Sequence, residues 1–243
     1  MRATVANTSS ALMALVAVFL SPTLAAAHIS VASGPGYAGT TQEITFQVGH
    51  GCAGSDGKLN DTVSVTIDIP DSVLSLRAVP SPFGKVTVQK TGAVVKSVTW
   101  QKKTEDVLLS DDDFYKFTIR VPVPNTPFST IYFVAHQTCN SSAGPITVDW
   151  SGTAATASED AGAAEPAPAL IVLPAHRPGW NKLTVPVAVV ADLFSKVFAD
   201  AQIVWKGTAA FSSNPVTQTQ IEGTAGVTAL GDLGAGDEIW VKY

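Results

Sequence analysis

Alternation of apolar and polar residues across 41–150 is the feature that most restricts what this chain can fold into. It is clearest at Ile44, Phe46 and Val48 and again from 63 to 69, and period-two patterns of this kind are typical of strands with one buried face. Similar runs cover 94–101, 114–121, 130–137 and 146–150, with turn residues between them. Many short strands with little helical pattern predict a mainly β fold, a β-sandwich.

The composition changes after these runs. Residues 153–170 are rich in Ala, Ser, Glu and Pro and hold few large apolar side chains, so they are predicted to form a linker or long loop. Residues 171–243 then show apolar residues at helical spacing within 193–198 and strand-like runs at 201–205 and 238–241. This part is predicted to be a small C-terminal α+β extension, with added strands of the sandwich as the alternative.

The first 27 residues have the layout of a secretory signal peptide. Arg2 precedes an apolar stretch from Ala11 to Leu20, and Ala25-Ala26-Ala27 offers the small residues of a cleavage site. No later window holds ~20 consecutive apolar residues, so no membrane span is expected in the mature chain, residues 28–243. We therefore predict a periplasmic or secreted protein.

Charge and sulfur content restrict the partners of the mature chain. It has 14 Lys and Arg against 20 Asp and Glu, and no basic tract, so nucleic acid is not expected to bind. Cys52 and Cys139 are the only cysteines, and such a pair in an exported chain predicts a disulfide. Both methionines, Met1 and Met13, lie in the predicted signal peptide, so a metal bound by the mature chain would be held by nitrogen and oxygen.

Cleavage after Ala27 would give His28 a property that no internal histidine has. Its free α-amine and its imidazole Nδ1 can chelate one metal ion together, provided that both nitrogens are deprotonated. Amine and imidazole nitrogens suit Cu(II), which also has the highest affinity of the divalent first-row series. Residues 29–31 look like an edge strand that would hold the terminus in place. The sequence therefore predicts a Cu(II) site at His28.

Several motifs resemble those of the YcnI-like copper-binding proteins of bacteria. They cover most of residues 28–152 in order and are Ala27-His28-Ile29-Ser30-Val31, Ala38-Gly39-Thr40, Gly49-His50-Gly51-Cys52, Tyr132-Phe133 with Gln137-Thr138-Cys139, and Val148-Asp149-Trp150-Ser151-Gly152. The resemblance implies an immunoglobulin-like or Greek-key β-sandwich over 28–152. It also implies that Cu(II) is bound by the N-terminal histidine and a glutamate carboxylate, with a tryptophan beside the ion.

His28 and Trp150 match the histidine and the tryptophan of that family. An indole has no in-plane lone pair, so Trp150 is expected to cover the ion rather than to ligate it. The glutamate has no direct match, because counting from His28 places Gln42 at its position. Three alternatives remain open: a bulge that turns Glu43 inward, the amide oxygen of Gln42, or His50, which we favour because it lies beside a predicted half-cystine.

No catalytic motif is present, neither a phosphate loop, a G-x-S-x-G elbow nor an H-E-x-x-H pair, and no enzyme is expected. We expect an exported protein that stores, delivers or detoxifies copper, with a copper transporter or chaperone as a partner. Two other functions stay open: a metal-free adhesion or assembly module, because a β-sandwich does not determine function, and a copper-dependent oxidase.

Overall fold

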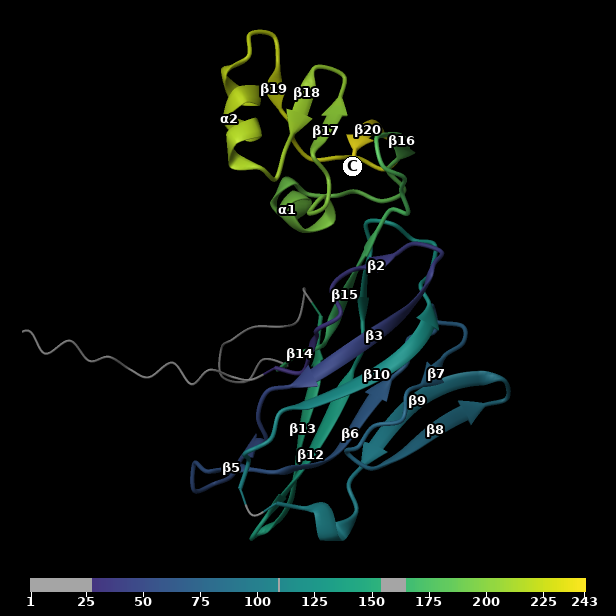
Figure 1. Cartoon of the computed structure of the whole chain (residues 1–243), viewed down its shortest axis with the longest axis vertical. Helices are drawn as coiled ribbons and strands as arrows, with labels where there is room; N and C mark the ends of the chain where they lie inside the picture. Colours follow the sequence, from purple (N-terminus) through teal and green to yellow (C-terminus); the bar gives the residue numbers. More distant parts are fainter. Residues whose placement is uncertain (1–27, 109, 154–164) are drawn as a thin grey trace, which may run out of the picture.

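The alternating runs form two packed sheets in a computed structural model that describes residues 28–108, 110–153 and 165–243 (Figure 1). The predicted signal peptide, 1–27, lies outside the described residues. The first sheet contains, in spatial order, β1 (Ser30–Val31), β3 (Thr41–Val48), β10 (Tyr115–Pro122) and β7 (Arg77–Ala78). The second contains β14 (Glu165–Pro166), β13 (Gly144–Gly152), β12 (Ala135–Ser141), β6 (Thr62–Asp68), β9 (Val94–Gln101) and β8 (Lys85–Thr91).

The core lies between these sheets, where the inward residues of each strand meet. Phe46 of β3, Phe117 of β10 and Trp100 of β9 are fully buried there, and each buried side chain of this size contributes roughly 1.5–3 kcal/mol through removal of its surface from water. The disulfide between Cys52 and Cys139 forms as predicted. It joins β12 to a small hairpin of β4 (Cys52–Ala53) and β5 (Leu59–Asn60). The mostly β sandwich expected from the sequence is confirmed.

Two strand predictions differ from the structure. The run 130–137 is two strands, β11 (Thr130–Tyr132) and β12, because the chain passes from a smaller sheet into the second sheet at the break between them. β8 was not predicted, because its side chains are almost all exposed and its apolar alternation is limited to Val86 and Val88.

The predicted linker, 153–170, is too long at its C-terminal end. β14 pairs with β13, and β15 (Ala169–Leu173) joins β11 and β2 (Gly36–Tyr37) in a three-stranded sheet. Ala167 and Leu170 are buried there. Short strands at a sheet edge tolerate proline, so the Pro and Ala composition did not exclude them. Residues 154–164 of the predicted linker lie outside the described residues.

Residues beyond β15 form a group of helices and strands at one end of the sandwich (Figure 1), called the C-terminal unit below, and its core also includes Phe128 and Leu173. Its sheet contains, in order, β16 (Trp180–Thr184), β20 (Glu238–Lys242), β17 (Ile203–Lys206), β18 (Ala209–Phe211) and β19 (Thr228–Ala229). The helices of this unit are α1 (Phe194–Val197), α2 (Pro215–Gly223) and the 3-10 helix η2 (Ala191–Leu193). The sandwich contains one 3-10 helix among its described residues, η1 (Thr104–Asp106). Asn214 caps α2 by accepting hydrogen bonds from two backbone N–H groups. No helix in the described ranges has the length and apolarity needed to cross a membrane.

A polar cluster joins this unit to the sandwich. The Tyr37 hydroxyl donates to Asp200 over 3.0 Å, and His176 Nε2 lies 3.6 Å from the same carboxylate. The His176 ring stacks on Tyr243, the last residue, with centroids 3.5 Å apart. The position of His176 just before Arg177 and Pro178 is typical of an exposed turn, but the C-terminal end of the chain folds back over the His176 ring.

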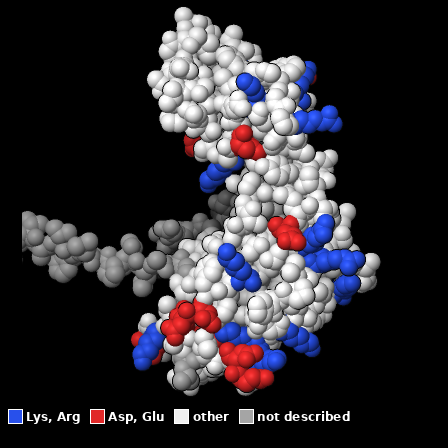
Figure 2. Space-filling view, viewed as in Figure 1, with Lys and Arg blue, Asp and Glu red and all other residues white. Residues whose placement is uncertain are grey.

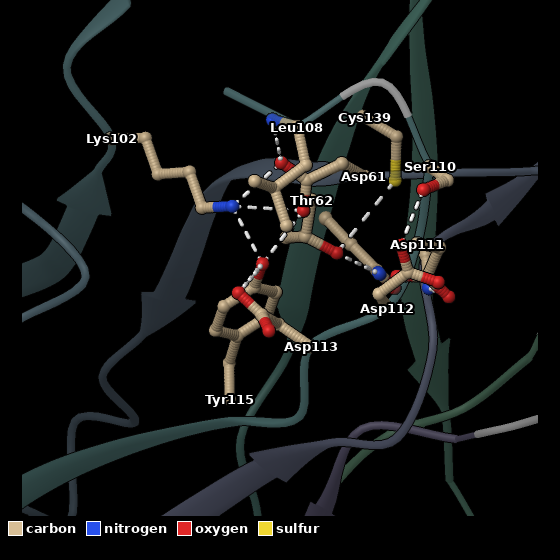
Figure 3. A network of polar contacts seen from close by, with 12 residues as sticks. Asp61, Thr62, Lys102, Leu108, Ser110, Asp111, Asp112, Asp113, Tyr115 and Cys139 are labelled. Carbon is tan, nitrogen blue, oxygen red and sulfur yellow. Dashed lines mark hydrogen bonds and ion pairs between the residues drawn. The ribbon is translucent and has the colours of Figure 1, made fainter. Parts of the chain in front are cut away.

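A second polar network is buried in the sandwich (Figure 3). Asp61 is fully buried and accepts hydrogen bonds from Lys102 Nζ at 2.6 and 2.8 Å, from the Tyr115 hydroxyl at 2.7 Å and from the Leu108 N–H at 2.8 Å. Burial, followed by the hydrogen bond to Asp61, raises the pKa of Tyr115. The phenol therefore stays protonated and remains a donor. Every oxygen of the Asp61 carboxylate has a partner, as a buried charge requires.

Candidate metal site

His28 is held at the sandwich edge by the strand that follows it. β1 pairs antiparallel with β3, with Ser30 opposite Gln47, and Ala32 N–H donates to the Thr45 carbonyl. Ile29 is buried in the core. The predicted edge strand at 29–31 is thus present, and it places His28 close to the Val48 end of β3. The imidazole keeps 33% of its surface exposed.

Trp150 of β13 contacts the His28 ring directly. The two ring centroids are 5.5 Å apart and the planes are inclined at 62°. Trp150 is 5% exposed and belongs to the sandwich core, so the protein interior fixes its position. Its Nε1–H is buried and has no hydrogen-bond partner among the described residues. The structure thus brings together the two residues that the family resemblance matched.

The carboxylate beside these two residues is Glu165, which the sequence reasoning missed. β14 runs parallel to β13 with Glu165 opposite Trp150, and Glu165 Oε2 lies 3.8 Å from His28 Nε2. Glu165 lies in the C-terminal part of the predicted linker, 153–170, just before Pro166. No local pattern marks it, because a two-residue strand carries no alternation. Only the pairing of β14 with β13 reveals it.

Gln42 and Glu43 lie at the other end of β3. Gln42 is opposite Val121 in β10, whereas β1 meets β3 at Gln47, and five strand residues span roughly 17 Å. The Gln42 amide oxygen already accepts from Tyr37 N–H and the Thr40 hydroxyl. Glu43 is exposed and points away from the core. No bulge turns it inward, since β3 pairs with β10 in continuous register.

His50 follows β3 and is tied to the disulfide region. Its Nδ1 is 2.6 Å from the Gly51 carbonyl, and its own carbonyl accepts from Gln137 Nε2 over 2.9 Å. Asp111 accepts from Gly51 N–H next to it. These contacts hold His50 in the loop before Cys52. The carboxylate next to His28 comes from Glu165.

The remaining histidine of the sandwich, His136, is satisfied on the sheet surface. Its Nδ1 is 2.6 Å from Asp149 and its Nε2 is 3.3 Å from Asp68. Although partial burial opposes protonation, these carboxylates together raise the pKa of His136. Both ring nitrogens face carboxylates, so His136 behaves as an ion-paired surface residue.

The donor set at His28 fits a divalent metal that prefers nitrogen and oxygen. Among residues 28–108, 110–153 and 165–243, no three His, Cys, Asp or Glu side chains are grouped to hold a metal ion. His28 and Glu165 supply two groups, and the α-amine released by cleavage would supply another. Because the carboxylate faces Nε2, it favours the tautomer with hydrogen on Nε2 and a lone pair on Nδ1. That lone pair is the one that the chelate requires.

These features define a β-sandwich with a histidine, a tryptophan and a carboxylate grouped at one edge. The model of a domain of unknown function, DUF1775, which is the YcnI-like domain, matches residues 28–172, and the chain belongs to this family. The match extends past residue 152, where we had ended the domain, and includes Glu165. A crystal structure of an uncharacterized protein from Nocardia farcinica with an immunoglobulin-like fold is 24% identical, covering 60% of this chain and 97% of that protein, with a TM-score of 0.48. No curated protein matches this chain.

Glu165→Gln is expected to weaken Cu(II) binding to the processed protein by about 10–100-fold, the usual effect of losing a group that orients a metal-binding histidine. Competition with a chelator of known Cu(II) affinity measures the change. Glu43→Gln is the matched control, since Glu43 is an exposed carboxylate at the far end of β3, and should have no effect. Equal affinities for the Glu165 variant and the unmodified protein would remove Glu165 from the site.

Proposed function

We propose that this protein is exported and binds one Cu(II) ion at His28, for storage, delivery or detoxification of copper rather than for catalysis. In the processed protein the α-amine and Nδ1 of His28 hold the ion, Glu165 orients the imidazole, and Trp150 shields one side of the site from water. Copper is the cargo, and a copper transporter or chaperone is the expected partner.

The observation that carries this proposal is the convergence of Glu165 and Trp150 on His28. Each belongs to a different strand, and each is placed by main-chain pairing rather than by a flexible loop. A half-exposed imidazole between a carboxylate and a buried indole is accessible to an ion from solution. The imidazole and amine nitrogens of His28 form a chelating pair that suits Cu(II).

The proposal also explains why copper loading would follow export. In the uncleaved chain the nitrogen of residue 28 is a peptide amide, whose lone pair is delocalised and is a poor metal donor at neutral pH. The chelate ring cannot form there without deprotonating the amide. Signal cleavage therefore creates the site.

Calorimetry with Cu(II) on protein that begins at His28, beside protein with one extra N-terminal alanine, tests the proposal. We expect tight 1:1 binding in the first and a loss of at least about a thousandfold in affinity, roughly 4 kcal/mol, in the second. The two forms share every side chain from residue 28 to 243, so a difference in Cu(II) affinity reports on the free α-amine of His28. Equal affinities would overturn the proposal.

A further inference from the structure

Three tryptophans lie on one face of the sheet in the C-terminal unit, two of them exposed and the third, Trp205, half-buried. Trp205 of β17 is directly opposite Trp240 of β20, and Trp180 of β16 lies one diagonal away, opposite Lys242. Directly opposed side chains have Cβ atoms about 5 Å apart and diagonal ones ~7–8 Å, within reach of indole rings. The three rings therefore form one surface, which we call the tryptophan platform.

The core of the unit does not use this platform. Ile239 and Val241, which alternate with Trp240 along β20, are fully buried on the opposite face. Trp180 and Trp240 keep 53% and 49% of their surface exposed. Exposing indoles together is unusual in the absence of a partner, because tryptophan is on average a highly buried residue. The three rings and Gly207 line a shallow hollow of about 320 Å³.

Polar groups of both signs border the platform. Lys182 is opposite Trp240 and pairs with Glu238 over 2.7 Å, and Lys242 is opposite Trp180. Figure 2 shows basic side chains on the side of the unit where Figure 1 draws β16 and β20. The border thus offers both hydrogen-bond donors and acceptors, with the charge of Lys182 balanced by a carboxylate.

We propose that the tryptophan platform binds the pyranose rings of a neutral oligosaccharide. A pyranose has an apolar C–H face that can pack on an indole and a rim of hydroxyls that both donate and accept. The platform offers the complementary arrangement, with apolar ring surface in the hollow and Lys182, Glu238 and Lys242 at its border. A few polar groups that fix orientation around an apolar surface are typical of small-molecule sites.

The charge pattern favours this ligand over an anionic membrane. Membrane-surface sites rely on clusters of lysine or arginine without balancing carboxylates. Here the border named above holds two lysines, Lys182 and Lys242, which is not a basic cluster, and the Glu238 carboxylate beside Lys182 would repel an anionic lipid surface. A neutral ligand meets no such repulsion. The inference goes beyond copper binding and does not depend on it, because the platform and His28 lie in different units.

Calorimetry with chitohexaose and with cellohexaose on the whole mature protein tests this inference. We expect binding of at least one of them, with the affinity reduced by at least about tenfold in the double variant Trp180→Ala/Trp240→Ala, as for hot-spot aromatic residues. Phe114→Ala is the matched control, an exposed aromatic residue on the sandwich, and should bind as the unmodified protein does. Circular dichroism and urea denaturation that match those of the unmodified protein show that the double variant is folded.

Three results would overturn the inference. They are no binding of either oligosaccharide at millimolar concentration, equal binding by the double variant, and binding only to phosphatidylglycerol vesicles that the double variant loses. The last result would assign the platform to a membrane surface instead. Failure of copper binding would leave these outcomes unchanged, so the two proposals are tested separately.

Discussion

His28→Ala is expected to abolish tight Cu(II) binding in the processed protein, with a loss on the order of a thousandfold or more in affinity. The variant retains an α-amine but has no imidazole nitrogen to close the chelate ring. In this variant Glu165 has no imidazole to orient, and Trp150 has no metal ion to shield from water. Chelator competition at pH 7.5, where the unmodified protein should bind one ion, measures the loss.

His136→Ala provides the control for this experiment. His136 is a half-exposed histidine on the same sandwich, but both of its nitrogens face carboxylates, so we expect its removal to leave copper affinity unchanged. Tight binding retained by His28→Ala would move the site to His50 or His136 and contradict the resemblance on which it rests.

Fluorescence gives an independent measurement of the same site. The Trp150 ring centroid lies 5.5 Å from that of His28, so bound Cu(II) should quench Trp150 emission, and Trp150→Phe should remove much of the quenching. Trp180 and Trp240 belong to the other unit and should contribute little. Undiminished quenching in Trp150→Phe would place the ion away from Trp150.

The sequence predicted those parts of the fold and site that are encoded locally. Alternating strands such as β3 and β9 were found because each buries one face, so that their pattern of side chains reports their structure directly. His28 was found because a predicted cleavage site precedes it, and Trp150 because it lies in a motif that resembles one of the family. The disulfide followed from having only two cysteines in a chain that is predicted to be exported.

The missed features depend on contacts between distant segments. Glu165 becomes part of the site because β14 pairs with β13, and nothing near Glu165 in the sequence encodes that pairing. His176 is covered because the C-terminal residue returns to stack on it. The tryptophan platform needs the order β16-β20-β17, which unites residues 180, 205 and 240 on one face. Strand pairing between remote segments was therefore the missing information in all three cases.

Lys102→Met is expected to lower the free energy of unfolding by about 3–5 kcal/mol, the usual cost of leaving a buried charge without its partner. Asp61 is completely buried, and Lys102 is the cation within its hydrogen-bonded network (Figure 3). Without the ammonium group, Asp61 keeps only neutral donors, the Tyr115 hydroxyl and the Leu108 N–H. The double variant Asp61→Asn/Lys102→Met should lose less stability than the single one, because the asparagine carries no charge and its amide oxygen still accepts a hydrogen bond. Urea denaturation of the disulfide-intact protein measures each change.

Lys96→Met, which breaks an exposed ion pair with Asp71, is the control and should leave stability nearly unchanged, since exposed pairs contribute little. A loss in Lys102→Met no larger than in Lys96→Met would show that water reaches Asp61 and that the network does not stabilise the sandwich.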